Sequence, residues 1–299
     1  MELNLKSAFF WPINRTIVRS FRFSTRLFWQ RAMFRVLSQV APRLAIERAI
    51  RVMLTPPRQP FSDAELAVLE EASLLPVPLI PGRLIAWRWG RAADPAVVLV
   101  HGWGGRGTQM RGFIEPLLAR GFSVVAYDAP GHGMTGGEES SLPHVLQGLN
   151  AVLDHLGRVH AVIGHSLGGA VTAMALAQRP AVKRAVLIAP PASLADSSRR
   201  IAAALNWPEA LRAAVQRRIE YRFGLDWSGF EAERSSGTQP LLVIHDRKDR
   251  EVPFAEGHRH ASNWPRARML ETAGLGHRRV LEDPMVIQAS VDFVAGEPS

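Results

Sequence analysis

Short apolar runs alternate with helix-patterned segments over most of the chain. The runs typical of strands are RLIAWRW (83–89), AVVLVHG (96–102), FSVVAYD (122–128), HAVIGH (160–165), KRAVLIAP (183–190), PLLVIHD (240–246) and ARMLET (267–272). Between them, QMRGFIEPLLARG, residues 143–156 and LGGAVTAMALAQ are typical of helices. Strands that alternate with helices imply parallel crossovers, and continuous apolar strands imply burial on both faces. The sequence therefore predicts an α/β fold whose mostly parallel sheet is covered by helices on both faces.

A serine boxed between glycines lies between two of these elements. Gly164-His165-Ser166-Leu167-Gly168 follows a predicted strand and precedes a predicted helix. This context fits a strained strand-turn-helix that exposes the serine hydroxyl at the carboxyl edge of the sheet. The amino end of the following helix, with its partial positive charge, would then face an anion forming at the serine. A tight turn without chemistry is the alternative, and we favour Ser166 as a nucleophile.

Candidate partners for this serine follow other predicted strands. Asp249 comes after the strand at 240–246, and His277 comes after the strand at 267–272. A histidine oriented by a carboxylate can take the proton of a serine hydroxyl. The glycine-rich loop His101-Gly102-Trp103-Gly104-Gly105 could present the Trp103 amide to an oxyanion, with the Leu167 amide as the second donor.

Other residues compete for these roles. Asp246 stands at the strand end itself and Asp196 lies beyond the preceding strand, so both are rival acids to Asp249. His258 and His260 also follow the acid, on a helix that we expect to be solvated. An alternative metal site would be built from His245, Asp246, His258 and His260. We favour Asp249 and His277, and we expect neither a metal nor a cofactor.

Five motifs in this order resemble the α/β-hydrolase fold superfamily over about residues 75–299. They are HGWGG at 101–105, YDAPGHG at 127–133, GHSLGG at 164–169, DREVP at 249–253 and GLGHR at 274–278. The resemblance implies Ser166 as nucleophile, Asp249 as the acid that orients the base, and His277 as the base. It also implies that the turn at 128–133 is structural. A serine at this position argues against the haloalkane dehalogenase and epoxide hydrolase branches, which carry aspartate there.

The expected function is therefore a serine hydrolase that cleaves a small-molecule carboxylic ester through an acyl-enzyme. A thioesterase, an amidase or a carbon–carbon bond hydrolase would use the same three residues. A catalytically silent fold that binds lipid or protein is the alternative from another class. Residues 194–239 are helix-rich and separate two predicted strands, so we expect a lid over Ser166. Its expected pocket residues are Trp207, Leu211, Val215, Phe223 and Trp227.

The net charge of +9 lies in an N-terminal arm, residues 1–60, ahead of a hydrolase domain at 61–299. The arm holds 11 Lys and Arg against two acids, whereas the other residues hold 25 of each. One expected helical stripe contains Arg15, Arg19, Arg22 and Arg26, opposite Ile13, Ile17, Phe21 and Phe28. A second basic amphipathic stretch, PRLAIERAIRVML, ends before Thr55-Pro56-Pro57. Either the apolar side docks on the hydrolase domain, or residues 13–54 contact an anionic membrane. Nucleic acid is not expected, because the phenylalanines need burial.

Cysteine usage and hydropathy exclude some further classes. The chain has no cysteine, which rules out disulfides, thiolate metal sites and a cysteine nucleophile. No apolar run approaches the roughly 18 residues that span a bilayer. The N-terminal residues lack the long apolar region and the cleavage site of a secretory signal. We expect a cytoplasmic protein, with peripheral membrane contact as the open alternative.

Overall fold

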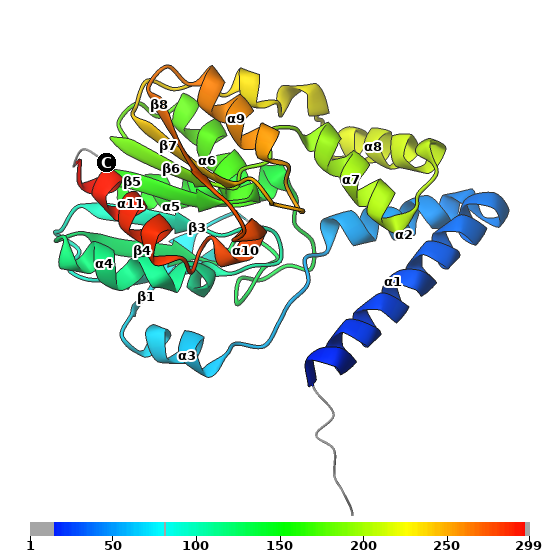
Figure 1. Cartoon of the computed structure of the whole chain (residues 1–299), viewed down its shortest axis with the longest axis horizontal. Helices are drawn as coiled ribbons and strands as arrows, with labels where there is room; N and C mark the ends of the chain where they lie inside the picture. The colour runs from blue at the N-terminus through cyan, green and yellow to red at the C-terminus, as the bar shows by residue number, and fades with distance from the viewer. Residues whose placement is uncertain (1–14, 81, 297–299) are drawn as a thin grey trace, which may run out of the picture.

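The computed structural model describes residues 15–80 and 82–296, with side chains from residue 27 onward within those spans. In this part of the chain, eight strands form one sheet in the order β1-β2-β4-β3-β5-β6-β7-β8 (Figure 1). The strands are β1 (Ser73–Pro78), β2 (Arg83–Trp89), β3 (Ala96–Val100), β4 (Ser123–Tyr127), β5 (Val159–His165), β6 (Arg184–Ile188), β7 (Leu241–Asp246) and β8 (Ala267–Thr272). From β4 to β8, neighbouring strands run parallel, while β1 and β2 pair antiparallel. The predicted α/β fold with a mostly parallel sheet is confirmed.

Sequence analysis does not predict β1, the strand at one edge of the sheet. Pro76 and Pro78 interrupt its pattern, because proline has no N–H to donate to a strand ladder. An edge strand tolerates proline, since one of its sides pairs with no neighbour. The position of β1 at the edge therefore explains why a proline-rich segment can still form a strand.

Helices cover both faces of the sheet. On one face lie α5 (Leu142–Leu156), α6 (Leu167–Ala177) and α9 (Phe254–Asn263), and on the other lie α4 (Ile114–Ala119) and α11 (Pro284–Ala295). Strand side chains alternate between the two cores, so Val98 and Val100 face the first, and Val97 and Leu99 face the second. The expected helix at 109–121 begins instead as a 3-10 helix (Gly107–Phe113), and α4 starts afresh two residues before Pro116.

A short helix, α3 (Asp63–Glu70), joins the arm to the sheet. It begins with a capping box, in which Ser62 and Glu65 bond each other's backbone amides. The Glu65 carboxylate also binds Arg106, at 2.6 Å from its Nε, just beyond the HGWGG loop. This contact fixes the loop relative to α3.

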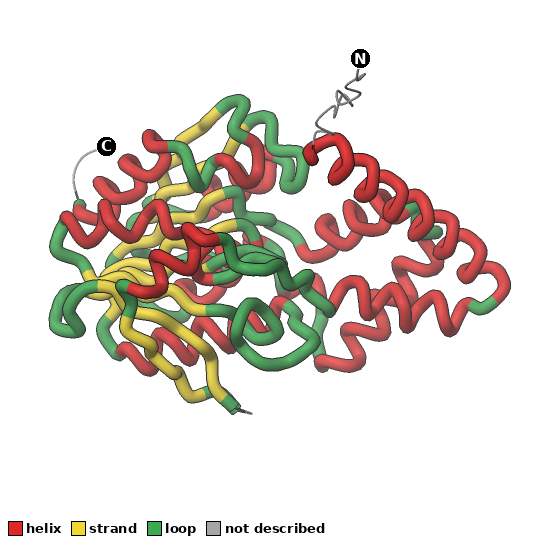
Figure 2. Tube along the Cα trace, turned by 90° about the horizontal axis from the view of Figure 1, so that it is seen from below, coloured by secondary structure: helices red, strands yellow, loops and turns green. Residues whose placement is uncertain are grey.

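A separate layer of helices lies beside the sheet (Figures 1 and 2). It consists of α1 (Arg15–Val40) and α2 (Pro42–Leu54) from the arm, and α7 (Leu194–Leu205) and α8 (Glu209–Phe223) from the insertion. These helices share one hydrophobic cluster, in which the rings of Phe34 and Trp207 lie 5.1 Å apart. The apolar side of residues 34–54 is therefore docked within the protein. Among the described residues, no helix is long and apolar enough to cross a membrane.

Part of the predicted arginine stripe cannot be placed. Ile13 lies outside the described residues, and so do the side chains of Arg15, Arg19, Arg22, Arg26, Ile17 and Phe21. Phe28 is described, and its side chain is 64% exposed. The expectation for this stripe remains a prediction.

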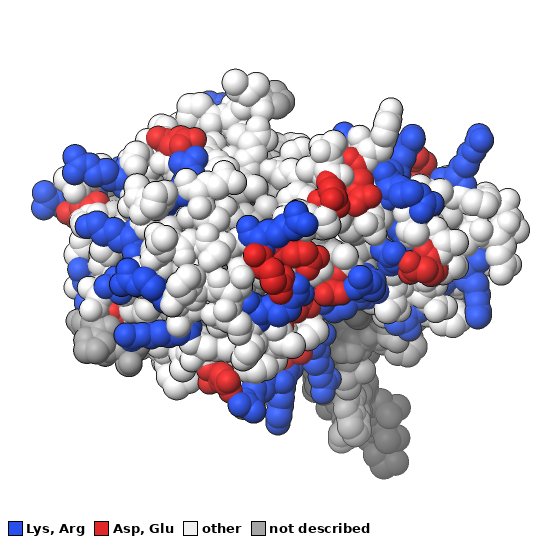
Figure 3. Space-filling model, turned by 90° about the horizontal axis from the view of Figure 1, so that it is seen from above, with Lys and Arg blue, Asp and Glu red and all other residues white. Residues whose placement is uncertain are grey.

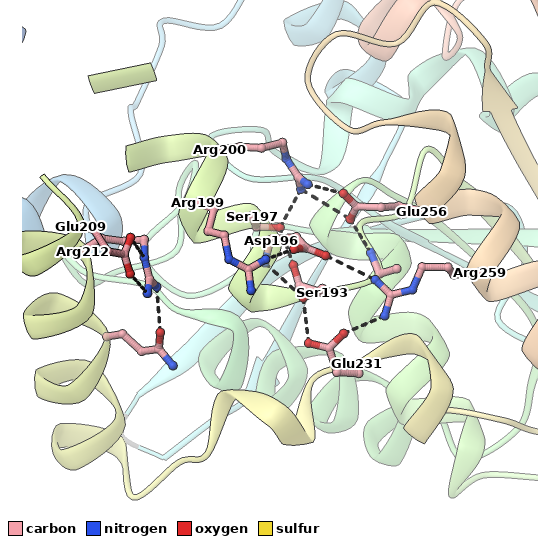
Figure 4. Close-up of polar contacts among 12 residues, drawn as sticks. Ser193, Asp196, Ser197, Arg199, Arg200, Glu209, Arg212, Glu231, Glu256 and Arg259 are labelled. Carbon is pink, nitrogen blue, oxygen red and sulfur yellow. Dashed lines mark hydrogen bonds and ion pairs between the residues drawn. The ribbon is translucent and has the colours of Figure 1, made fainter. Parts of the chain in front are cut away.

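The insertion is closed at its base by polar contacts (Figure 4). Ser193 and Glu231 form an isolated antiparallel bridge, and the Ser193 hydroxyl donates to the Glu231 carboxylate at 2.7 Å. Arg259 of α9 binds the same carboxylate at 2.7 Å. The buried Glu256 of α9 pairs with Arg200 of α7. The base of the insertion is thus attached to α9, a helix that packs on the sheet.

The outer face of the insertion carries both signs of charge. Figure 3 shows Lys and Arg side chains interspersed with Asp and Glu over the molecule seen from above. Arg212 pairs with Glu209 at 2.5 Å, and Arg222 pairs with Glu139 at 2.6 Å. Such pairing agrees with a solvated helix face and offers no concentrated positive surface for a phosphate.

Candidate active site

Ser166 lies in a sharp turn between β5 and α6. Its φ is 52°, in the left-handed region that a residue with a side chain rarely adopts. The turn is held by the Ser166 amide, which donates to the Ile188 carbonyl at 2.8 Å. Backbone strain of this kind costs about 1–3 kcal/mol and occurs where the fold fixes a functional group.

The glycines of this motif are required by close backbone contacts. A Cβ at Gly164 would lie 2.5 Å from the carbonyl oxygen of Gly168. A Cβ at Gly168 would lie 2.3 Å from the carbonyl oxygen of Val100, on the neighbouring strand β3. Real Cβ atoms do not approach a carbonyl oxygen this closely, so any larger residue would push the turn away from the sheet. The glycines therefore fix the position of Ser166.

The structure brings Ser166, His277 and Asp249 into one chain of hydrogen bonds. His277 lies on the short helix α10 (Gly276–Arg279) and is buried. Its Nε2 is 2.9 Å from the Ser166 Oγ, and its Nδ1 is 2.7 Å from the Asp249 Oδ2. With a proton on Nδ1, the imidazole donates to the carboxylate and accepts from the serine hydroxyl.

The carboxylate of Asp249 is oriented by its own turn. Its Oδ1 accepts hydrogen bonds from the amides of Glu251 (2.8 Å) and Val252 (3.0 Å), which leaves Oδ2 for His277. Burial by itself would raise the pKa of Asp249, but hydrogen bonds from His245 and His277 bring that pKa well below its usual range. The carboxylate is therefore ionised at neutral pH.

The two rival acids have other partners. Asp246 accepts hydrogen bonds from the Lys248 amide (2.8 Å), the Thr272 hydroxyl (2.8 Å) and the Leu275 amide (2.9 Å). Burial would raise the pKa of Asp246, and these hydrogen bonds lower it overall. Asp196 pairs with Arg199 and Arg259. Among the described residues, neither carboxylate contacts His277.

The alternative metal site is not assembled. His258 is exposed, as expected for a solvated helix, but the expectation is wrong for His260. His260 is buried, and its Nε2 lies 3.0 Å from the Pro191 carbonyl oxygen, because this side of α9 packs against the chain leading into the insertion. In the described part of the chain, no group of three or more His, Cys, Asp or Glu is placed to hold a metal ion.

The HGWGG loop and the start of α6 each have an unused amide beside the serine. Within the described residues, the amides of Trp103 and Leu167 donate to no protein acceptor. The Leu167 amide opens α6 directly after Ser166, so it belongs to the partially positive end of that helix. The Trp103 amide belongs to the loop that follows β3, and both residues line the same cavity as Ser166.

A buried histidine that sequence analysis does not single out supports this loop. His101 Nε2 accepts a hydrogen bond from the Ala129 amide at 3.0 Å, so its Nδ1–H donates to the Gly102 carbonyl at 2.7 Å. Burial lowers the pKa of His101 to about 3, which keeps the ring neutral. The adjacent turn at 128–133 is held by Asp128, which accepts hydrogen bonds from the Gly107 amide (2.7 Å) and the Met134 amide (2.6 Å).

Two further histidines at strand ends touch the hydrogen-bonded chain. The Nε2 of His165, the last residue of β5, lies 2.9 Å from the His277 carbonyl oxygen. Burial lowers the pKa of His165 to about 3, so a neutral ring donates this bond. His245, near the end of β7, has its Nε2 3.5 Å from the Asp249 Oδ2. The signal that could have identified both is a histidine ending a buried apolar run, because a buried polar group must find a partner.

A cavity of ≈ 700 Å³ opens above Ser166 and His277. Its lining is mostly apolar. Besides residues of α5, α6 and the loop after β7, it includes Trp103 of the HGWGG loop, Ile201, Phe223 and Trp227 of the insertion, and Val52, Met53 and Leu54 of the arm. Buried apolar side chains around a few convergent polar groups are typical of a small-molecule site.

The expectation for the insertion's pocket residues holds only in part. Phe223 and Trp227 line the cavity, as predicted. Trp207, Leu211 and Val215 do not, because their sides of the insertion pack against α1 and α2 in the shared hydrophobic cluster. The sequence shows that these residues are apolar. It does not show that they pack against α1 and α2, which lie more than 150 residues away in the chain.

Comparison with known proteins agrees with this geometry. Residues 95–229 match the model of the alpha/beta hydrolase fold family. The chain is 31% identical to a pimeloyl-[acyl-carrier protein] methyl ester esterase of Xanthomonas campestris over 260 residues, 68% of this chain and 96% of that protein. It is 34% identical to a mouse sn-1-specific diacylglycerol lipase over 132 residues, 43% of this chain and 42% of that one.

Solved structures share the fold. An esterase from Pyrococcus furiosus superposes with a TM-score of 0.64 at 22% identity, covering 82% of this chain and all of that one (100%). Together with the sheet order and the family match, this agreement confirms the fold that the five sequence motifs suggested. The chain belongs to the alpha/beta hydrolase family and is a hydrolase of the esterase type.

Proposed function

We propose that Ser166, His277 and Asp249 form a catalytic triad that hydrolyses a carboxylic ester. The observation that carries the proposal is the unbroken chain of hydrogen bonds from the Asp249 carboxylate through His277 to the Ser166 hydroxyl, at 2.7 and 2.9 Å. Its outer end faces an apolar cavity. A nucleophile in contact with a base that is itself oriented by an acid is the arrangement that acyl transfer requires.

In the first half of the reaction, the Ser166 Oγ attacks the acyl carbon while its proton passes to His277 Nε2. The imidazolium that forms is stabilised by the ionised Asp249 beside Nδ1. The carbon–oxygen bond to the alcohol then breaks, and Nε2 returns the proton to the leaving alkoxide. The alcohol departs, and the acyl group remains on Ser166 as an ester.

In the second half, water takes the place of the alcohol. His277 Nε2 removes a proton from the water as its oxygen attacks the acyl carbon, and the bond to Ser166 Oγ breaks as that oxygen regains the proton. A carboxylic acid leaves and the free enzyme is restored. Each step consists of proton transfer and bond exchange at carbon, for which these side chains suffice.

The oxyanion of each tetrahedral intermediate is assigned to the amides of Trp103 and Leu167. The support is that neither amide has an acceptor among the described residues and that both border the cavity beside Ser166. Preorganised amides at a developing negative charge are worth about 3–4 kcal/mol each by the removal of single donors. The amino end of α6 adds its partial positive charge at the same place.

A carboxylic ester is preferred over a thioester, an amide or a carbon–carbon bond. By their names, the Xanthomonas relative acts on a methyl ester and the mouse relative on diacylglycerol, both carboxylic esters. The apolar walls of the cavity favour a substrate whose acyl or alcohol part is apolar.

Covalent labelling tests this proposal. The purified wild-type protein should react with a fluorophosphonate probe and hydrolyse a short p-nitrophenyl ester, because both reactions need an activated serine. Ser166→Ala should lose the label and lower kcat by about 10⁴-fold or more. The matched control is Ser141→Ala, since Ser141 also borders the cavity but lies 3.1 Å from the Nδ1 of a different histidine, His144. Near wild-type ester turnover by Ser166→Ala would refute the mechanism.

A further inference from the structure

Helix α1 has two apolar faces, and the described residues cover one of them. Phe34 is fully buried against α2 and the insertion, with Leu27 and Leu37 packed beside it. On the other side, the side chains of Trp29, Val36 and Val40 are 69%, 55% and 72% exposed. At 3.6 residues per turn, these three exposed positions fall within about 40° of each other around the helix. They form one stripe.

Two more exposed apolar residues lie on the same pair of helices. Phe28, whose ring contacts that of Trp29, is 64% exposed, and Leu44, at the start of α2, is 53% exposed. We call these five residues, Phe28, Trp29, Val36, Val40 and Leu44, the arm stripe. Exposed apolar residues are normal when they are scattered, but a concentration of them, here four on α1 and one on the neighbouring α2, indicates an interaction surface.

The charged side chains of the arm in this region are almost all positive. Residues 27–54 contain a single acid, Glu47, and five arginines, all of them exposed: Arg31, Arg35, Arg43, Arg48 and Arg51. A hollow of ≈ 650 Å³ between α1 and α2 is lined by Trp29 and Met33 on one side and by Arg48 and Arg51 on the other. Figure 2 shows α1 running along the outer side of the helical layer, away from the sheet. The surface therefore combines apolar side chains with positive charge.

We infer that α1 and α2 bind the surface of an anionic phospholipid bilayer through the arm stripe. Apolar side chains can enter the acyl boundary, while arginines beside them bind lipid phosphates. A second copy of this chain fits less well, because a symmetric contact would bring the same arginines together with little acid to neutralise them. Nucleic acid would leave the valines and the tryptophan uncovered.

The hollow between α1 and α2 lies next to the cavity above Ser166. Val52 of α2 borders both the hollow between α1 and α2 and that cavity. The bilayer-binding surface and the cavity thus lie on two sides of a single helix. Binding to a bilayer would hold the cavity near esters dissolved in that bilayer, although the binding itself does not depend on the proposed chemistry.

Co-sedimentation of the full chain with vesicles tests the inference. We expect the protein to pellet with phosphatidylglycerol-containing vesicles at low salt, to pellet less at high salt, and to remain in solution with pure phosphatidylcholine vesicles. The triple variant Trp29→Ser, Val36→Ser, Val40→Ser should bind anionic vesicles about tenfold more weakly or worse, because it removes the apolar anchor. Arg35→Gln with Arg48→Gln should weaken the same binding through charge alone.

A matched control removes three exposed apolar residues elsewhere. Leu74→Ser, Ile80→Ser and Met285→Ser replace side chains that are 63%, 89% and 55% exposed, and vesicle binding should be unchanged. Turnover of a short water-soluble ester without vesicles should be the same in all variants, which shows that each is folded and separates this test from the proposed mechanism. The inference is overturned if the wild type does not pellet with anionic vesicles, or if the stripe variant pellets as well as the wild type. A wild-type dimer that the stripe variant converts to a monomer would also overturn it, in favour of a second copy.

Discussion

At the scale of single residues, the end of β7 carries two carboxylates with different partners. Asp249 is held by two amides of its own turn and directs its other oxygen to His277. Asp246 instead accepts hydrogen bonds from the chain around β8, including the amides of Gly274 and Leu275. Asp246 therefore fixes the loop that leads to His277, while Asp249 contacts His277 itself.

This difference predicts different effects for the same substitution. Asp249→Asn should lower kcat for a soluble ester by about 10⁴-fold, because an amide cannot hold the imidazole in the required tautomer or stabilise its charged form. Asp246→Asn should lower kcat less. It should lower the free energy of unfolding by about 1–3 kcal/mol, because the new NH₂ group would face backbone N–H donors whose hydrogen bonds the carboxylate now accepts. Steady-state kinetics and urea unfolding of both variants check this. A larger loss of kcat in Asp246→Asn would mean that Asp246 is the catalytic acid.

At the scale of elements, the arm and the insertion form one structural unit. Residues of α2 pack against α8 through the shared hydrophobic cluster, and the end of α2 contributes Val52, Met53 and Leu54 to the cavity wall. The arm lies outside residues 95–229, which match the family model. The arm therefore forms part of the cavity wall.

Two tryptophans of the insertion separate substrate contact from packing. Trp227 lines the cavity, whereas Trp207 packs on Phe34 away from it. Trp227→Ala should change the ratio of rates for long and short acyl esters. Trp207→Ala should leave that ratio near the wild-type value and lower the free energy of unfolding by about 3 kcal/mol or more, because it empties a buried site.

The measurement is a p-nitrophenyl ester series of increasing acyl length, together with thermal unfolding. Trp227 and Trp207 make a matched pair, because they lie in the same hydrophobic cluster and are 1% and 7% exposed, respectively. An unchanged ratio in Trp227→Ala would show that this part of the cavity does not hold the acyl group.

At the scale of the whole molecule, buried neutral histidines should make stability depend on pH. Burial lowers the pKa of His101 and His165 to about 3, and the pKa of His132 and His260 to about 4. In the unfolded chain these groups titrate near pH 6.5. All four histidines therefore lower the free energy of unfolding as the pH falls. Burial raises the pKa of Asp128 to about 6, so between its ordinary pKa and pH 6 Asp128 acts in the opposite direction.

The sign follows from proton binding. Between about pH 6.5 and pH 4 the unfolded histidines bind protons that the folded ones refuse, so stability is highest above pH 6.5 and falls on acidification. Within that window each histidine lowers the free energy of unfolding by about 1.4 kcal/mol per pH unit of acidification. Below about pH 6, Asp128 cancels the contribution of one of the four histidines. Urea midpoints measured from about pH 7.5 down to about pH 5 should therefore decrease. His260→Gln should flatten the dependence, and a midpoint that rises on acidification would contradict the assignment of buried neutral rings.

The strands from β3 to β7 could be predicted from adjacent residues alone, because a strand buried on both faces is a continuous apolar run. The sequence by itself also determined the turn at Ser166 and the order in which Asp249 and His277 follow it, since each motif is local to one strand end. These are short-range patterns, and the conformation that they require can be read from adjacent residues. The strand β1 could not be predicted in this way. A strand tolerates prolines only at the edge of a sheet, and a local pattern does not show which strand will lie at the edge.

Only the tertiary structure decided which side chains meet across distant elements. The contact of His165 with the His277 backbone and the packing of Trp207 on Phe34 join segments more than 100 residues apart in the chain. The DREVP motif favours Asp249 over Asp246 as the partner of His277, and the loops after β7 and β8 give the two carboxylates different partners. Packing distinguishes them, because a carboxylate pairs with whichever donors the folded backbone brings within hydrogen-bonding distance.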